Sequence, residues 1–597
     1  MIGELVRLYD RLVEAGQAPR YGYSVENVPW GLDIADDGAI THVIPFGTLT
    51  KNKQFRRMMS VPAHALRTVK IQANFLCDNS SYLLGADANG ATDKAAKRFA
   101  AAAELHRQVL ANADEAEARA VLAFFSRTPQ ATVVEEKLSE GDWKKALTGN
   151  FVLCRNGLPL SENPTMQQYW DSWFASGDED GDQAAPSSET MQSVVSGQAV
   201  VPALTHPNIR GVRNAQSSGS ALVSFNAPAY LSYNKKQDQN APMSKREAFA
   251  YTTALNTVLK DDQYTRTIND GSLTIVSWAE SGQAEYSAEM NMCIEGVVGV
   301  DQQDLIATVT ALSKGNPVDF NGVRLNPDEH FYILGLAPNA ARLSVSFFLK
   351  DTYGSYMEHV RRHYEDLDIE RPKFDKRRDL PVWMLLAQTV PPATGGKKRI
   401  PASPRTVSDL FKAILTGAPY PTSLLTAVEN RIGVEHDVPR AKAAIIKAYF
   451  LRHPNNQCPK EVLQVSINKE STNVPYVLGR LFALYEDIQH AANPGINTTI
   501  GDRFFTNAST MPAVVFPHLG DLAKKHLRKL PTGTRIYYTK RIADLMTRIG
   551  ENFPTRLSLP EQGAFQLGYY FETQERYKGK NKDDNKETSK EEGVVNE

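Results

Sequence analysis

The spacing of apolar residues predicts a mixture of helices and strands up to about residue 390. Residues 2–13 carry apolar side chains at the spacing of an amphipathic helix. Apolar residues on both sides of Asp36-Asp37-Gly38 predict a β-hairpin that joins residues 32–34 to residues 39–44. The Ala-rich stretch from Thr92 to about Ser126 predicts helix.

Residues 69–76 alternate between apolar and polar side chains, and this alternation predicts a strand. Successive side chains of a strand point to opposite faces, so the apolar residues would line one face. The other face would carry three polar side chains, Lys70, Gln72 and Asn74. The turn-forming residues 78–81 follow directly.

Beyond residue 402 the apolar pattern is helical almost throughout. Apolar stripes at residues 477–488, 515–530 and 542–549 predict an all-α bundle of five to seven helices with short connections. The Pro- and Gly-containing segment 391–402 is typical of a linker. Residues 577–597 are rich in Lys, Asp, Glu and Asn without an apolar period, so we expect a disordered tail.

These patterns together predict an α+β fold. A large mixed N-terminal region, residues 1–390, would precede the linker 391–402 and a helical bundle at residues 403–576. Hydrophobic residues make up 42% of the chain and charged residues 23%, which suffices for more than one core.

The charge distribution is more informative than the net charge of -1. Residues 51–70 contain basic residues and no acidic one, and residues 397–460 hold eleven basic against four acidic residues. Basic tracts attract phosphate backbones, although a solvated protein face has the same composition. Residues 156–209 hold seven acidic residues and no Lys or Arg. This tract would repel DNA, so we expect it to face away from DNA or to meet a basic partner.

The basic N-terminal tract and the polar strand face form the first candidate DNA-binding surface. Amide side chains can donate to and accept from base edges, and lysine and arginine can contact phosphates. The candidate readers of base edges are Lys70, Gln72, Asn74 and Asn79, and the candidate phosphate contacts are Lys51, Lys53, Arg56 and Arg57. A solvent-facing strand gives the same pattern, and Asn79 also fits a turn asparagine that satisfies its own backbone.

A polar loop before residue 245 forms the alternative reading surface. It contains Asn226 and Asn240 as candidate readers, with Lys235 and Lys236 as candidate phosphate contacts. Ser244 and Glu247 follow, and their spacing also fits a helix-capping box.

Basic residues opposite an apolar stripe form a track in the helical region. The candidate phosphate contacts on it are Lys524, Lys525, Arg528, Lys529 and Arg541. Such a track can hold single-stranded DNA by its backbone, and a solvated helix face is the alternative.

No motif gives positive support to an enzyme. His436-Asp437 resembles the His-Asp pair of metal-dependent phosphohydrolases, but such sites need further ligands on neighbouring helices. A metal-dependent nuclease or phosphohydrolase built on this pair therefore stays an alternative, and we expect no catalytic residue, no metal and no cofactor. The four cysteines are scattered, and no apolar run reaches the length of a membrane span, so we expect a cytoplasmic protein.

Eight segments, in this order along the chain, resemble one known family. They are residues 75–85 (FLCDNSSYLLG), 222–230 (LVSFNAPAY), 240–244 (NAPMS), 251–256 (YTTALN), 334–344 (LGLAPNAARLS), 478–483 (LGRLFA), 499–505 (TIGDRFF) and 526–530 (HLRKL). Together they resemble the large subunit of the type I-C CRISPR–Cas surveillance complex, Cascade, over residues 45 to 575.

The resemblance implies a non-catalytic DNA-recognition role in an RNA-guided complex. Such subunits recognise the short motif beside the target, the PAM, in double-stranded DNA, help to open the duplex for guide pairing and hold the displaced strand. Sequence specificity is left to base pairing in RNA-guided systems. The resemblance also implies that residues 474–576 are similar to the small subunit, which in this subtype can also be translated separately.

The partners implied by the resemblance are nucleic acids and other proteins of the complex. They are the guide crRNA, the Cascade backbone and handle-binding subunits, the small subunits, the target duplex with its displaced strand, and a recruited helicase–nuclease. A purely structural scaffold that bridges other subunits is the remaining alternative. It predicts assembly without any dependence on the motif beside the target.

Overall fold

The structure is a computed structural model. It describes residues 1–46, 48–49, 55–64, 71–90, 92–176, 190–225, 227–231, 233, 235, 237–295, 302–393, 395, 399–453 and 458–591. The backbone alone is described for residues 48–49, 55–56, 176, 295, 302–305 and 577–591. Contacts divide the chain into two compact units, residues 1–207 with 223–257 and residues 208–222 with 258–597.

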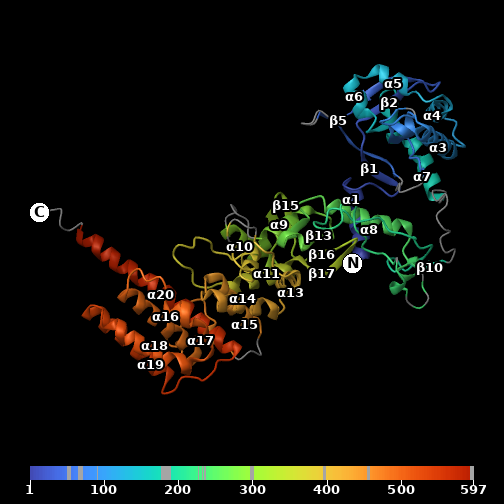
Figure 1. The fold of residues 1–597 in the computed structure, drawn as a ribbon. Coiled ribbons are helices and arrows are strands. Elements are labelled where there is room, and N and C mark those ends of the chain that lie inside the picture. Colours follow the sequence, from blue (N-terminus) through green and yellow to red (C-terminus); the bar gives the residue numbers. More distant parts are fainter. Residues whose placement is uncertain are drawn as a thin grey trace. The chain divides into compact units, whose positions relative to one another are not determined.

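The first unit contains a five-stranded sheet covered by helices (Figure 1). Its strands run in the order β3-β2-β8-β7, and β9 pairs with β8. The strand bounds are β2 Trp30–Ile34, β3 Ile40–Pro45, β7 Cys77–Asn79, β8 Asn150–Arg155 and β9 Leu158–Pro159. The hairpin predicted around Asp36-Asp37-Gly38 is confirmed, because β2 and β3 pair antiparallel with Leu32 opposite Val43.

Helices of the first unit pack on this sheet and on one another. Their bounds are α1 Ile2–Glu14, α2 Ser80–Leu83, α3 Asp93–Val109, α4 Ala116–Ser126, α5 Ala131–Lys137, α6 Glu140–Ala146, α7 Pro164–Ser176 and α8 Lys245–Val258. The predicted N-terminal helix is confirmed by α1. The Ala-rich stretch forms two helices, α3 and α4, rather than one. A two-stranded ribbon, β1 (Tyr23–Asn27) with β6 (Met58–Pro62), completes the described core of this unit.

The strand predicted at residues 69–76 is wrong where the chain is described. Residues 71–76 form a loop, and residues 65–70 lie outside the described residues. Leu76 has a φ of 57°, in the left-handed region, and its amide donates to His106 Nε2 at 2.8 Å. The backbone amide of Asn74 donates to the Asp78 carboxylate at 2.8 Å. Side chains thus take the hydrogen bonds that a neighbouring strand would otherwise receive.

The second unit begins with a four-stranded antiparallel sheet. Its order is β12 (Thr265–Ile268), β13 (Leu273–Ala279), β16 (His330–Asn339) and β17 (Arg342–Thr352). Helices α9 (Ala284–Glu295), α10 (Gln302–Ser313) and α11 (Tyr353–Leu367) accompany it, together with the short hairpin β14 (Val318–Phe320) and β15 (Val323–Leu325). The last strand among the described residues ends at Thr352, so the predicted α+β class with a helical C-terminal region is confirmed.

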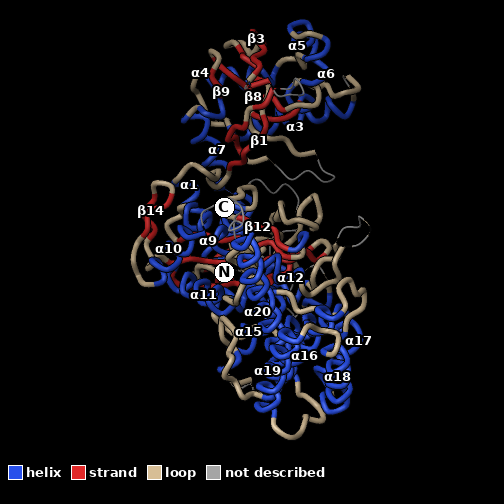
Figure 2. Tube along the Cα trace, turned by 90° about the vertical axis from the view of Figure 1, so that its left-hand side faces the viewer, coloured by secondary structure: helices blue, strands red, loops and turns tan. Residues whose placement is uncertain are grey.

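The helical region continues from α12 to α20 (Figures 1 and 2). The bounds are α12 Val382–Ala387, α13 Pro404–Thr416, α14 Thr422–Glu435, α15 Arg440–Arg452, α16 Val474–Ala492, α17 Ile500–Thr510, α18 Pro512–Leu527, α19 Thr532–Ile549 and α20 Leu559–Glu591. Eight helices therefore follow residue 402 in the described part of the chain, one more than the upper prediction.

The predicted linker 391–402 does not separate two cores. One cluster of buried apolar residues runs from Leu273 in the sheet to Phe571 in α20. The Asn269 side chain donates to the Ala402 carbonyl at 2.8 Å and accepts from the Ala402 amide at 2.9 Å. The helices after residue 403 thus share their core with the sheet, and the division between the two units falls near residues 207 and 258 instead.

The predicted disordered tail also differs from the structure. Helix α20 continues to Glu591, so residues 577–591 are helical, and residues 592–597 lie outside the described residues. Once a helix has formed, adding a residue fixes only that residue's backbone and gains a hydrogen bond. A charged composition without an apolar period therefore does not by itself stop a helix that has begun in a core.

Helices α16 and α20 approach each other very closely. A Cβ atom on Gly479 would lie 2.8 Å from the Phe565 carbonyl carbon, 2.9 Å from the Tyr569 amide nitrogen, and closer still to the Phe565 oxygen. A Cβ atom on Gly568 would likewise overlap the Tyr476 carbonyl. Glycine at both positions lets the two backbones touch, and this contact holds α20 against the other C-terminal helices.

Candidate nucleic-acid interface

The basic track predicted in the helical region is described in full, and it lies on α18, α19 and the turn between them. The apolar residues Val515, Phe516, Leu519, Ala523 and Leu527 of α18 are buried. Because a helix turns once in 3.6 residues, this stripe leaves the intervening basic residues in solvent. The exposed basic residues are Lys524, Lys525, Arg528, Lys529, Arg535 and Lys540.

Two of these lysines have intramolecular partners that water also reaches. Lys524 Nζ lies 3.1 Å from Asp521 Oδ1 in an exposed pair, and Lys529 Nζ donates to Asn493 Oδ1 at 2.9 Å. Exposed contacts of this kind contribute little, so a phosphate can replace them. Burial lowers the pKa of the nearby His526, and the Lys529 charge lowers it further, so His526 adds no charge to this surface at neutral pH.

An exposed aromatic side chain stands on the same helix as two of these bases. Tyr537 on α19 is 53% exposed, and Arg541 donates to its hydroxyl at 2.9 Å. The Arg541 guanidinium also lies 5.6 Å from the Tyr537 ring centroid. Aromatic rings beside cations are typical of surfaces that hold single-stranded nucleic acid, since any base can stack on them. Nothing in the sequence distinguishes Tyr537 as a functional residue, because only the fold shows that its neighbour Tyr538 is the buried one.

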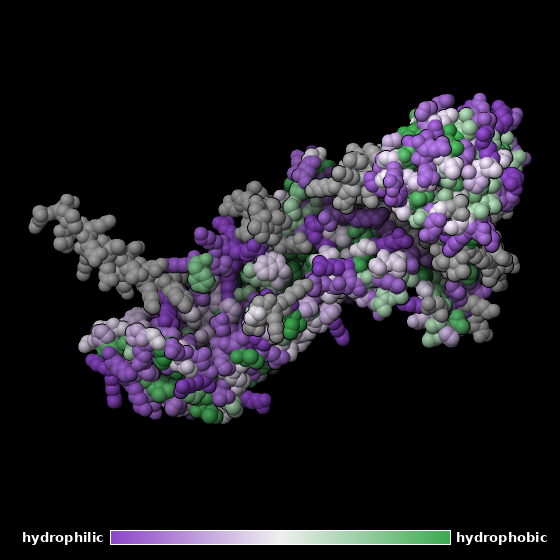
Figure 3. Space-filling model, turned by 45° about the horizontal axis from the view of Figure 1, so that its top comes forward, coloured by the Kyte–Doolittle hydropathy of each residue, from purple (hydrophilic) through white to green (hydrophobic). Residues whose placement is uncertain are grey.

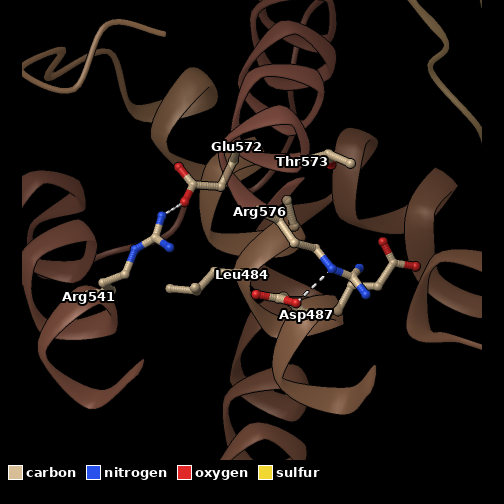
Figure 4. Close-up of a pocket in the computed structure, with 8 residues that line it drawn as sticks. Leu484, Asp487, Arg541, Glu572, Thr573 and Arg576 are labelled. Carbon is tan, nitrogen blue, oxygen red and sulfur yellow. Dashed lines mark ion pairs between the residues drawn. The ribbon is translucent and has the colours of Figure 1, made fainter. Parts of the chain in front are cut away.

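Arg541 is only partly exposed and has a buried acidic partner within the chain. Its guanidinium forms an ion pair with Glu572, whose side chain is only 3% exposed (Figure 4). Arg480 Nε donates to the same carboxylate at 2.9 Å. A buried carboxylate that lost one partner would be strongly destabilising, so Arg541 serves the packing of α16, α19 and α20. That Arg541 binds phosphate stays a prediction.

A second ion pair in Figure 4 closes the same group of helices. Arg576 Nε lies 2.8 Å from Asp487 Oδ1, and Tyr538 donates to Asp487 at 2.9 Å. These bonds join α20 and α19 to α16. They fix α19, which carries the exposed Arg535 and Lys540, against α16 and α20.

The predicted N-terminal phosphate contacts are described only in part. Lys51, Lys53 and Lys70 lie outside the described residues, and for Arg56 only the backbone in β5 (Phe55–Arg56) is described. Arg57 lies 3.3 Å from Glu162, and its guanidinium lies 4.8 Å from the Phe46 ring centroid. Asp171 pairs with Arg20 at 3.0 Å, so two carboxylates of the acidic tract at residues 156–209 have basic partners within the chain.

The three predicted amide readers have different surroundings. Asn74 is 2% exposed, so it is not available to a DNA groove in this conformation. Asn79 caps α2, because its Oδ1 accepts from the Ser81 amide at 3.1 Å and from the Ser81 hydroxyl at 2.6 Å. The solvent-facing strand on which the readers were placed is absent over residues 71–76. Gln72 remains partly exposed in the loop.

A buried histidine on α3, His106, hydrogen-bonds to the backbone of the loop that contains these amides. His106 Nδ1 contacts the Ala102 carbonyl at 2.7 Å, while Nε2 accepts from the Leu76 amide. Burial lowers the pKa of His106 to about 4. The neutral ring with its proton on Nδ1 satisfies both bonds, and it stays neutral at physiological pH.

The alternative reading loop is also described in part. Asn226 and Lys236 lie outside the described residues, and Lys235 is exposed. Asn240 Nδ2 donates to the Lys235 carbonyl at 3.2 Å, so this amide closes its own loop. The capping box is confirmed, since the Ser244 amide donates to Glu247 at 2.7 Å and the Glu247 amide donates to the Ser244 hydroxyl at 3.1 Å.

The His436-Asp437 pair lies at a helix end. His436 ends α14 with a φ of 54°, and its amide donates to the Ile432 carbonyl at 2.7 Å. Burial raises the pKa of the Asp437 carboxyl. Within the described ranges, no three His, Cys, Asp or Glu side chains gather as a metal site requires. The geometry accounts for His436 as a helix cap.

The face of the molecule shown in Figure 3 is mainly hydrophilic, with hydrophobic residues in small separate groups. None of the helices in the described part of the chain combines the length and the apolar character that crossing a membrane requires.

The described residues thus form an α+β protein whose C-terminal helices carry an exposed basic surface. The family model of the CRISPR-associated proteins termed Cas_Csd1 matches residues 5–577. The chain therefore belongs to the Cas_Csd1 family and is a Cascade-type CRISPR-associated subunit. No curated protein matches it.

Proposed function

We propose that this chain is the non-catalytic large subunit of a type I-C Cascade complex. In this role it recognises the PAM in double-stranded DNA, helps to open the duplex for guide pairing, holds the displaced strand and supports recruitment of a separate helicase–nuclease. The family match over residues 5–577 supports a Cascade-type subunit, and the resemblance of the eight segments supports the subtype.

The observation that carries the strand-holding part is the exposed surface of α18 and α19. Lys524, Lys525 and Arg528 project from it, and Tyr537 lies on the next helix. Cations that track a backbone, combined with an aromatic ring for stacking, bind single strands without reading their sequence. A displaced strand has an arbitrary sequence, so this type of contact fits it.

PAM reading is assigned to the N-terminal basic tract with Gln72. Lys51, Lys53, Arg56 and Arg57 supply a run of cations without an acidic residue between them. Gln72 is partly exposed and follows that tract along the chain. A glutamine can make two hydrogen bonds to one adenine edge in the major groove.

The decisive experiment measures duplex binding by the guide-loaded complex, with and without this chain, across a library of flanking motifs. The proposal predicts that tight binding requires both the chain and one class of flank. In that assay Gln72→Ala should cost about 1–3 kcal/mol on the preferred flank and much less on others. Equal binding without the chain, or indifference to the flank, would reduce the protein to a scaffold.

Strand holding is tested with a charge reversal and a matched control. The triple variant Lys524→Glu, Lys525→Glu and Arg528→Glu should weaken binding of the opened duplex, and the slope of log K against log salt should flatten by about 0.7 per lost single-strand phosphate contact. Charge reversal of the exposed Lys94 and Lys97 on α3 changes the net charge in the same direction and should leave the slope unchanged.

A further inference from the structure

Residues 371–383 form a basic and aromatic segment between α11 and α12. Their sequence, RPKFDKRRDLPVW, contains five basic and two acidic residues. Phe374 is 80% exposed and Trp383 is 57% exposed, although both are among the most costly side chains to leave in water. Single exposed apolar residues are ordinary, but two large aromatic rings within one strongly basic segment call for an explanation.

Leu380 and Val382 anchor the end of the segment in the apolar core, and the buried Arg440 holds its earlier part. The Arg440 side chain is 5% exposed, and its Nη1 donates to Asp375 Oδ2 at 2.8 Å and to the Arg377 carbonyl at 2.7 Å. Its Nη2 donates to the Arg378 carbonyl. Arg440 thereby neutralises Asp375, so the outward charge of the segment is more positive than its sequence suggests.

A cation also lies against the tryptophan. The Arg377 guanidinium lies 5.8 Å from the Trp383 ring centroid, which ties the loop to the first turn of α12. Lys373 and Lys376 are exposed, and neither pairs with a carboxylate in the described part of the chain. We call this set the Trp383 surface; its members are Lys373, Phe374, Lys376, Arg377 and Trp383.

We propose that the Trp383 surface binds single-stranded DNA, with bases stacked on Trp383 and Phe374 and phosphates held by Lys373 and Lys376. Charge complementarity selects a polyanion, and the exposed rings select one whose bases are unpaired, because a duplex hides the faces of its bases. Binding of this kind is salt-dependent and tolerant of sequence.

The segment lacks the neutral polar side chains that can both donate to and accept from a ribose hydroxyl. The 2′-hydroxyl of RNA is both a donor and an acceptor, and proteins that choose RNA contact it. Residues 371–383 contain no Ser, Thr, Asn or Gln, and Arg440 holds one of the two carboxylates. This inference rests on the proposed function, because the unpaired DNA would be the strand that is displaced when the duplex opens. The Trp383 surface is then a contact for that strand separate from the α18 and α19 surface.

The test uses a fluorescein-labelled oligothymidylate of about 20 nucleotides and the full chain carrying Lys524→Glu, Lys525→Glu and Arg528→Glu, so that the α18 and α19 surface does not mask the result. Trp383→Ala and Phe374→Ala should each weaken its binding about 5- to 150-fold, the range found when a base-stacking aromatic is replaced by alanine. Lys373→Gln with Lys376→Gln should flatten the salt slope by about 0.7 per contact. Leu158→Ala, at a large exposed apolar residue outside the surface, should change neither quantity.

A second readout locates the contact directly. An oligonucleotide with 5-iodouracil in place of thymine forms photochemical crosslinks to aromatic side chains that stack on it. The crosslinked peptide is expected to contain Phe374 or Trp383. This readout does not depend on a variant's stability, so a poorly folded variant cannot produce a false positive.

Three outcomes would overturn the proposal. Unchanged oligothymidylate binding in both aromatic variants would show that the rings do not stack. Loss confined to an oligouridylate probe would assign the surface to RNA. If the aromatic variants bind oligothymidylate normally but no longer assemble into the complex, the Trp383 surface would be a protein interface instead. None of these depends on the flanking motif, so a failure here is distinct from a failure of the PAM-reading proposal.

Discussion

Replacing Gly479 by alanine tests whether α16 and α20 really pack backbone against backbone. In an open helix position, Gly→Ala stabilises a protein by about 1 kcal/mol through helix propensity. At Gly479 the added methyl group would lie 2.8–2.9 Å from backbone atoms of Phe565 and Tyr569, and closer still to the Phe565 oxygen. No side chain can rotate to relieve that overlap, so the two helices must separate.

The expected cost follows from this geometry. Overpacking a core costs about 1–3 kcal/mol, and a clash with backbone belongs at the upper end. Subtracting the propensity gain of about 1 kcal/mol leaves a net loss of about 2 kcal/mol. Hydrogen exchange measures this locally: amide protection in α16 and α20 should fall about 30-fold, since each 1.4 kcal/mol is a factor of ten.

The matched control is Gly433→Ala in α14. An ideal Cβ atom at Gly433 meets no atom within 4 Å, so the same substitution there should preserve or raise protection. If Gly479→Ala also preserves protection in α16 and α20, the close approach of the two helices is refuted.

Three further predictions concern single side chains. Asn79→Ala should lower the stability of the first unit by about 1 kcal/mol in urea unfolding through loss of the cap, whereas Asn79→Ser should preserve it; equal losses would refute the capping role. Burial raises the pKa of Glu429 to about 7. The contribution of protonated Glu429 to the stability of the fold is therefore fully present below about pH 4.5, and it is lost as the pH rises through 7. Glu429→Gln, which can still accept from Gln566, should therefore raise the urea midpoint more at pH 8 than at pH 5, and a pH-independent effect would contradict this. Glu572→Leu should cost about 3–5 kcal/mol because it leaves Arg480 buried without its carboxylate, and the double variant with Arg480→Met should recover most of that loss in the same assay.

Local patterns were sufficient for the regular elements. Helix α1 and the hairpin of β2 and β3 follow from the period of their apolar residues and from the Asp36-Asp37-Gly38 turn. The buried stripe of α18 likewise follows from a period of 3.6, which also places Lys524 and Lys525 in solvent. Each of these patterns depends only on residues that are close together in the sequence, so the sequence alone is sufficient to predict these elements.

The predicted strand at residues 69–76 shows where the pattern is insufficient. Alternation indicates which side chains could face opposite ways, but a strand also needs a neighbour for its backbone hydrogen bonds. Here the amides of Asn74 and Leu76 bond to Asp78 and His106 instead. The His106 partner lies on α3, thirty residues from Leu76, and no local pattern indicates that contact.

The candidate interface shows the same limit of sequence patterns, because the sequence does not reveal which basic residues are paired inside the fold. The sequence shows that residues 524–541 are rich in basic residues. It also shows that the eight segments of the family resemblance follow one another in the expected order. It does not show that Arg541 pairs with buried Glu572, or that Tyr537 is exposed while Tyr538 is buried. Glu572 is also bound by Arg480, 92 residues earlier in the chain. Which cations remain available to DNA depends on such distant partners, because a charge in the interior must be neutralised by whichever group the fold brings to it.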